Sequence, residues 1–194
     1  MRKNVLVTTA LIAFGLTGSL GYTAVAQTNG TNQPATQSNG NQLSSFDRRF
    51  MTQAAQGSMA EVELSRLALR RGASNEVKQY AQQMINDHTQ ANARLMQLAN
   101  RKGVSVPKTL DAQHRQIRTQ LQRLSGRNFD QQYMMVMEND HVQTVSLFQS
   151  ATQQAQDRDV KAFASSTLPK LEGHLQMAQA MMGNNSAHNS HNQR

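Results

Sequence analysis

The sequence predicts an all-α protein, and within that class a ferritin-like four-helix bundle with one long crossover connection that contains a short extra helix. The first observation is composition: the 194 residues include 5% aromatic residues and three prolines, whereas Ala, Leu, Met, Gln and Arg, which favour helices, are abundant. The second is that apolar side chains recur at spacings of three and four along four long segments. The third is the order of connections, in which one long segment separates two tight turns.

Both ends of the chain are predicted to lie outside this bundle. Residues 1–26 have the features of a signal peptide, because two basic residues precede an apolar run that ends in a small-x-small cleavage site. Residues 27–44 are expected to be a disordered polar linker, and residues 183–194 a disordered His/Asn-rich tail. The bundle is therefore expected over residues 45–182 of an exported protein that is periplasmic or associated with the outer membrane.

The first hairpin is predicted from two long helices with recognisable ends. Residues 46–71 form the first helix, with Ser45 as its N-cap and Gly72 directly after its end. Residues 75–102 form the second, with Ser74 as its N-cap. The turn between them is short, so the two helices are expected to pack side by side in opposite directions.

The second hairpin follows a long connection. Residues 103–127 contain a short helix and are long enough to cross the bundle lengthwise. Asn128 is predicted to cap a long helix over residues 129–156. The last helix begins near Asp159 and is expected to kink at Pro169. One crossover between two hairpins is the ferritin-like topology.

Polar residues occupy positions where the helical stripes require apolar ones. Three of them are Glu61, His88 and His174. His141 is a fourth on one of two alignments of its stripe, and the other alignment places Asp140 inside. Counted from the predicted turns, His141 and His174 lie at one level, while Glu61 and His88 differ by about 4.5 Å at ~1.5 Å per residue. One layer of the core is therefore expected to hold three imidazoles and a carboxylate.

A short pattern, Asn-Asp-His-x-Gln, occurs at residues 86–90 and again at residues 139–143. In the second copy Glu138 lies three residues before the histidine, so the two side chains share a helix face. Glu-x-x-His is one of the two such elements that a di-iron bundle requires. The other element is missing, because Ile85 and Leu171 precede the remaining two histidines at that spacing. A complete dinuclear oxygen-activating site is therefore not predicted.

These polar residues predict a binding site for a transition metal such as Zn, Cu or Fe. The candidate ligands are Glu61, His88, Glu138, His141 and His174. Imidazole and carboxylate are suitable ligands for these metals in a chain without cysteine. The alternative is a hydrogen-bonded polar layer that sets helix register without metal. A binding protein is favoured over an enzyme, because the sequence has neither a Gly-x-Ser-x-Gly elbow nor a glycine-rich phosphate loop.

The formal net charge of +8 indicates affinity for anionic partners. Arginine pairs at residues 48–49 and 70–71, together with arginines within residues 115–127, supply much of this charge. In an exported protein such a surface favours anionic membrane lipids or a cell-wall polymer over nucleic acid. A second hypothesis follows: a non-catalytic cell-envelope protein with a structural polar layer and a basic surface that contacts membrane or wall polymers.

Several blocks of the sequence recur together in one known family. They are Phe50–Gly57 leading into Glu61–Leu64, Ala81–Thr89, the Ser-Gly-x-x-Phe-Asp-x-x-Tyr pattern of Ser125–Tyr133, Asp140-His141, and Thr167–Pro169 followed by His174. Over about residues 46–182 the chain thereby resembles the bacterial domain-of-unknown-function family 4142. The resemblance implies an exported ferritin-like bundle, since members are often labelled outer-membrane or periplasmic proteins. It implies no established activity, although the Glu and His positions match recurring polar positions of the family.

Overall fold

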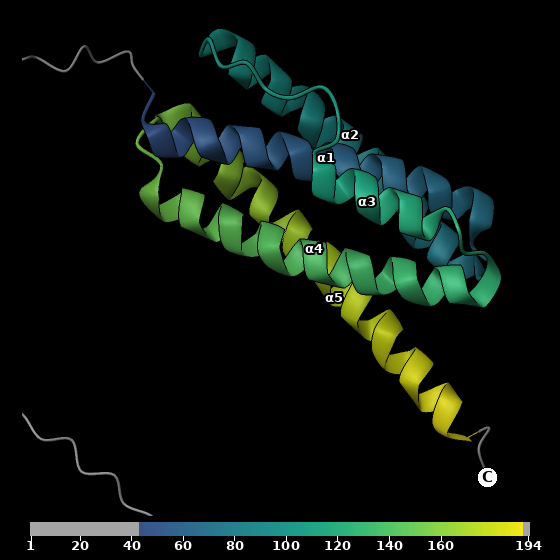
Figure 1. Ribbon diagram of the computed structural model, residues 1–194. Coiled ribbons are helices and arrows are strands. Elements are labelled where there is room, and N and C mark those ends of the chain that lie inside the picture. The colour runs from purple at the N-terminus through teal and green to yellow at the C-terminus, as the bar shows by residue number, and fades with distance from the viewer. Residues whose placement is uncertain (1–42, 192–194) are drawn as a thin grey trace, which may run out of the picture. The chain divides into compact units, whose positions relative to one another are not determined.

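The computed structural model describes residues 43–191, and their side chains as far as residue 183. This part of the chain is built from helices: α1 (Ser45–Arg71), α2 (Asn75–Arg101), α3 (Ala112–Leu121), α4 (Gly126–Gln154) and α5 (Arg158–His191). Four of them are long and form the bundle, and α3 is short and lies alongside it (Figure 1). The predicted all-α class is confirmed. The predicted signal peptide and most of the predicted linker lie outside the described residues.

The packing of the helices confirms the predicted topology. The most extensive contacts are within two hairpins, α1 with α2 and α4 with α5. The hairpins join through α1 against α4 and α2 against α5, and α3 contacts α1 and α4 from within the crossover. Each of the four long helices therefore faces the same central space.

Helix ends differ from the predicted ones at several points. The N-cap of α1 is Ser44, whose side chain accepts a hydrogen bond from the Asp47 amide at 3.0 Å. The prediction that Asn128 caps the next long helix is wrong, because α4 begins at Gly126, whose φ of 62° turns the chain directly into the helix. Finally, α5 continues to His191, through residues that composition assigns to a polar tail.

Two buried aspartates connect the hairpins at opposite ends of the bundle. Asp47 on α1 accepts hydrogen bonds from the amides of Gln156 and Asp157 in the α4–α5 turn, both at 3.2 Å. Asp130 on α4 accepts from the amides of Ala73 and Ser74 in the α1–α2 turn, with shortest distances of 3.1 and 2.8 Å. Each hairpin thus supplies the carboxylate that satisfies the free amides of the other hairpin's turn.

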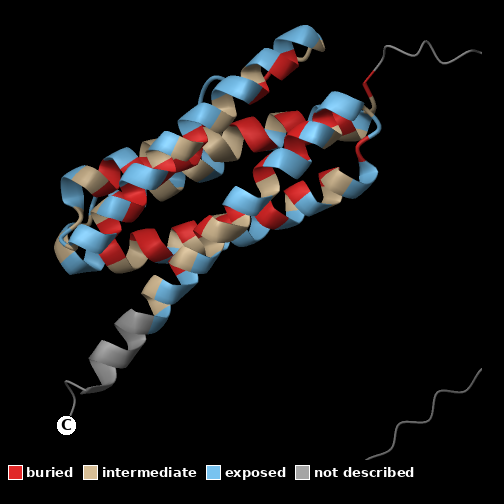
Figure 2. Cartoon of the chain, turned by 180° about the vertical axis from the view of Figure 1, so that it is seen from behind, coloured by how far each residue is buried: buried red, intermediate tan, exposed pale blue. Residues whose placement is uncertain are grey.

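The interior consists of two apolar clusters. The first lies toward the α4–α5 turn and includes Phe50, Leu95, Phe148 and Phe163. The second lies toward the α1–α2 turn and includes Leu64, Tyr80, Phe129 and Tyr133. Figure 2 shows the buried residues along the inward faces of the helices. Within residues 43–191, no helix combines the length and apolarity that a membrane crossing requires.

Candidate metal centre

A polar layer separates the two apolar clusters. Each long helix contributes one residue to it: Glu61 from α1, His88 from α2, His141 from α4 and His174 from α5. All four are buried, with 4% or less of each residue exposed. Of the two stripe alignments considered for α4, the structure selects the one with His141 inside. Four polar side chains from four helices therefore meet where a plain bundle would place leucines.

The three imidazoles converge closely. Ring nitrogens of His88, His141 and His174, one from each residue, all lie within 4.8 Å of one another. One of these contacts joins His141 Nε2 to His174 Nδ1 at 3.4 Å. This contact agrees with the predicted common level of His141 and His174. The Glu61 and His88 side chains also touch, although their positions along the bundle are predicted to differ by about 4.5 Å.

Hydrogen bonds outside the layer determine which nitrogen of two imidazoles carries the proton. His141 Nδ1 lies 2.8 Å from the Met137 carbonyl oxygen, which only accepts, so Nδ1 donates. His174 Nε2 lies 2.8 Å from Asp87 Oδ2, and an ionised carboxylate also only accepts. In the neutral rings, His141 Nε2 and His174 Nδ1 are therefore both lone-pair acceptors, and they face each other.

Glu61 is the acidic member of the layer. Its Oε2 touches His88 Nε2 at 2.5 Å, and its Oε1 lies 3.6 Å from His141 Nδ1. Neither contact has the geometry of a hydrogen bond, so both carboxylate oxygens and His88 Nε2 are buried without a hydrogen-bond partner in the described part of the chain. Burial by itself raises the pKa of Glu61. The imidazoles, His141 first and then His88, have a larger combined effect in the opposite direction and lower the pKa to about 2. The carboxylate is therefore ionised at neutral pH.

Asp87 orients His174 and is itself held by a cation. Its second oxygen accepts from Lys170 Nζ at 2.8 Å. Burial lowers the pKa of His174 to about 4, although the hydrogen bond to Asp87 acts in the opposite direction. His174 is consequently a neutral ring at neutral pH. Sequence reasoning did not select Asp87 or Lys170, although the Asn-Asp-His-x-Gln repeat placed Asp87 beside a site residue.

Two acidic groups near His141 lie differently from what the sequence suggested. Glu138 is half-buried on α4, and the group of converging ligand atoms found among the described residues consists of the three imidazoles without it. Asp140 is also half-buried rather than part of the layer. Burial raises the pKa of Asp140 to about 6, and the Glu61 carboxylate contributes in the same direction. The converging ligand atoms are therefore those of the three imidazoles, and the Glu61 carboxylate lies beside them, against His88.

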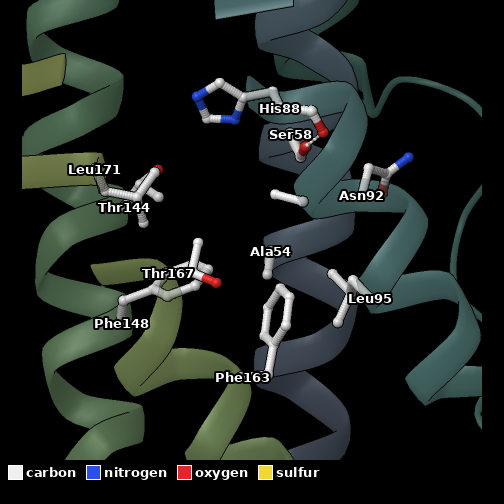
Figure 3. Close-up of a pocket in the computed structure, with 11 residues that line it drawn as sticks. Ala54, Ser58, His88, Asn92, Leu95, Thr144, Phe148, Phe163, Thr167 and Leu171 are labelled. Atoms are coloured by element: carbon white, nitrogen blue, oxygen red, sulfur yellow. Dashed lines mark hydrogen bonds between the residues drawn. The ribbon is translucent and has the colours of Figure 1, made fainter. Parts of the chain in front are cut away.

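A small cavity lies directly beside the layer, on the side of the first apolar cluster (Figure 3). Its volume is about 20 Å³, and its lining includes His88, Ala54, Leu95 and Phe148. A space of this size holds about one water molecule. In Figure 3 the His88 side chain extends from α2 into the space between the helices, and Ser58 Oγ donates to the His88 carbonyl oxygen at 2.9 Å. The layer thus has room on one side for one small ligand.

Comparison with known proteins places this site in a family without an assigned activity. The family model described as "Domain of unknown function (DUF4142)" matches residues 32–181. A DUF305 fragment from Deinococcus radiodurans is structurally similar at a TM-score of 0.65 and 14% identity, over 74% of this chain and 99% of the other. A DUF305 protein from Streptomyces coelicolor, described as secreted, is similar at 0.63 and 13% identity, over 73% and 94%.

A conserved hypothetical protein from Mycobacterium tuberculosis is similar at a TM-score of 0.57 and 14% identity, over 72% of this chain and 92% of the other. At these identities the likeness shows a shared helical-bundle fold. No curated protein sequence matches this chain significantly.

Proposed function

This chain belongs to the DUF4142 family, and we propose that it is an exported protein that binds a transition-metal ion, such as Zn, Cu or Fe, in its polar layer. The ligands are His88, His141 and His174, with Glu61 as the fourth. The proposed role is binding of the metal in the cell envelope rather than catalysis, because a tetrahedral ion held by three imidazoles and Glu61 would have no open position for a substrate.

The observation that carries this proposal is the pair of facing lone pairs on His141 Nε2 and His174 Nδ1, 3.4 Å apart. Two acceptors at this distance repel unless a cation lies between them. Protonation of His174 does not supply this cation, since burial lowers the pKa of His174 to about 4. A metal ion is a good one, because a carbonyl or carboxylate that receives the other N–H is the usual partner of a metal-binding imidazole.

The distances and donor types support the same assignment. Two nitrogens bound to one tetrahedral zinc at about 2.0–2.1 Å lie about 3.4 Å apart, which matches the His141–His174 contact. His88 lies within 4.8 Å of both and would close in by a small side-chain movement. The ionised Glu61 beside His88 then neutralises part of the ion's charge, and its buried oxygens, which lack a hydrogen-bond partner among the described residues, can bind the ion.

The proposed export of the protein is supported by its N-terminal sequence and not by the polar layer. The predicted signal peptide over residues 1–26 directs the chain to the periplasm, where it is free or associated with the outer membrane. The described secretion of the Streptomyces relative is compatible with this location. The basic surface and the structural reading of the polar layer remain the second hypothesis, in which the protein contacts anionic membrane or wall polymers and binds no metal.

Metal analysis of tag-free protein separates the two hypotheses. The expected result is one equivalent of Zn, Cu or Fe per chain after exposure to each ion and removal of excess. His141→Gln should lose most of this metal. Glu172→Gln is the control, because Glu172 lies on α5, where its side chain accepts a hydrogen bond from Gln149 outside the layer. Absence of bound metal in the unsubstituted protein, or equal metal in both variants, would overturn the proposal.

A further inference from the structure

A groove lies on the outer side of Glu61, between α1, α4 and the beginning of α3. Its volume is about 340 Å³. Carboxylates from three elements line it: Glu61 from α1, Asp140 from α4 and the N-cap Asp111 of α3. Among its lining residues in the described part of the chain, the basic group is the His114 imidazole, and there is no lysine or arginine. The groove is therefore an acidic hollow in a protein whose formal net charge is +8.

Two buried oxygens in this groove have no hydrogen-bond partner within the described residues. One is Oδ2 of Asp140, and the other is Oε1 of Glu61, a residue with 1% exposure. A buried carboxylate oxygen left unpaired carries a free-energy penalty that a bound cation would remove. Asp111, by contrast, is satisfied by His114, whose ring nitrogen lies 2.6 Å from Asp111 Oδ2. The groove oxygens that lack a hydrogen-bond partner therefore belong to Asp140 and Glu61.

The internal repeat offers a comparison for Asp140. Asp87 holds the equivalent position in the first copy of Asn-Asp-His-x-Gln, and both its oxygens are engaged, by Lys170 and by His174. Asp140 lines the groove together with Gly57 and Glu61, and the basic group that acts on it there is the His114 imidazole, which lowers its pKa. In the first copy of the motif both aspartate oxygens are therefore engaged, whereas in the second copy Asp140 Oδ2 has no hydrogen-bond partner among the described residues.

We propose that this groove is an outer binding site for a hydrated divalent cation, held by Asp140 and Glu61 through carboxylate oxygens before the ion passes to the imidazole layer. Carboxylate and water are the ligands that such an ion accepts while it keeps part of its hydration shell. Glu61 belongs to both sites, because it lines the groove and touches His88. The inward step rests on the proposed function, whereas the outer site does not.

Manganese is the probe for the outer site, since Mn²⁺ prefers oxygen ligands and leaves imidazole sites to zinc. The metal-free full chain is titrated with Mn²⁺ while the electron paramagnetic resonance signal of free Mn²⁺ is recorded. One Mn²⁺ should bind, and Asp140→Asn should weaken it by roughly 10-fold, as expected for losing one charge–charge contact. Asp140→Glu, which keeps the charge, should bind within about 3-fold of the original protein.

Glu172→Gln is the matched control. It removes the same charge near His174, but Glu172 lies on α5, which does not line the groove. Mn²⁺ affinity should be unchanged in this variant. Equal Mn²⁺ affinity in Asp140→Asn and Glu172→Gln would overturn the outer site. So would a complete lack of Mn²⁺ binding in the unsubstituted chain.

The rate of zinc loading tests the passage inward. In stopped-flow mixing with a fluorescent zinc indicator, Asp140→Asn should take up Zn²⁺ about 10-fold more slowly, because the anionic groove no longer concentrates the ion. Its equilibrium zinc affinity should change by less than about 3-fold. Unchanged rates would overturn the passage. If the unsubstituted protein binds no zinc, the proposed function fails, and the manganese titration of zinc-free protein still decides the outer site.

Discussion

Asp87 is the residue that turns a buried histidine into a candidate metal ligand. By accepting from His174 Nε2 at 2.8 Å, it leaves Nδ1 as the lone-pair nitrogen that faces His141. The Met137 carbonyl does the same for His141. A main-chain carbonyl and a side-chain carboxylate, neither of them a ligand, thus determine what the two rings present to the centre.

Asp87→Asn should therefore weaken metal binding without removing a ligand. An amide orients the imidazole less strictly and no longer increases its basicity, so zinc affinity is expected to fall about 10–100-fold. Competition with a chelator of known affinity measures this. The control is Glu172→Gln, which should retain the original affinity. Equal affinities for the two variants would show that Asp87 does not tune the site.

The buried His174 ring makes the stability of the metal-free protein depend on pH. The pKa of His174 is 6.5 in an unfolded chain and about 4 in the fold, where burial disfavours the charged ring. Between these values the unfolded chain binds a proton that the folded protein does not, so the free energy of unfolding falls as pH falls. The groups that face this ring are Asp87, His88, His141, Lys170 and, across the layer, Glu61.

The expected loss between pH 6.5 and pH 4 is about 3 kcal/mol at most from this group. Below about pH 4.5 the lowered pKa of Glu61 adds a loss of the same sign, since the unfolded carboxylate binds its proton first. Urea unfolding of chelator-treated protein at several pH values measures the slope. His174→Gln should give a shallower dependence, and an identical slope in both proteins would contradict the assignment.

At the scale of the elements, the hairpins are held together by their turns as well as by their helix faces. Gly72, Asp130 and the α1–α2 turn form one such junction. A Cβ placed on Gly72 would lie 2.8 Å from the Ala68 carbonyl oxygen and 2.9 Å from Asp130 Oδ1. The φ of Gly72 is −67°, which any residue can adopt, so the backbone conformation does not require glycine. Glycine is needed because a Cβ would lie too close to these two oxygens.

Gly72→Ala should accordingly displace Asp130 and lower the free energy of unfolding by about 1–3 kcal/mol, the cost of leaving buried amides unpaired. Gly57→Ala is the matched control. Its Cβ would meet only Thr144 Oγ1 at 3.9 Å, so the gain in helix propensity should stabilise the protein by about 0.5–1 kcal/mol. Urea unfolding of both variants provides the measurement, and destabilisation of equal size would refute the steric argument.

The helix boundaries show where local sequence was insufficient. Ser74 caps α2 as predicted, because a serine before a helix offers its hydroxyl to the first free amides. The α4 boundary was missed because Ser125 caps through its position alone, with no side-chain hydrogen bond, while the positive φ of Gly126 starts the helix. Local sequence was even less able to predict the burial of Asp47 and Asp130, because both side chains accept hydrogen bonds from amides of the opposite hairpin.

For the whole molecule, the two apolar clusters on either side of the polar layer are expected to keep the protein folded without metal. Metal binding should then add stability, because the ion binds the folded chain and not the unfolded one. At a free zinc concentration of 100 times Kd the gain is about 2.7 kcal/mol, or roughly 5–10 °C in Tm for a domain of this size. Differential scanning calorimetry measures it. His141→Gln should show no zinc-dependent shift, and a shift of equal size there would place the ion elsewhere.

The sequence by itself determined the all-α class, the two hairpins with their crossover, and the polar positions Glu61, His88 and His174. These follow from periodicity and spacing, which are properties of single helices and their connections. Only the tertiary structure decided that His141 rather than Asp140 enters the layer, that Glu138 stays outside the imidazole group, and that Asp87 orients His174. Those outcomes depend on the rotation of each helix about its axis and on contacts between helices far apart in sequence. A periodic pattern leaves both open, because neighbouring stripes on one helix can satisfy it equally well.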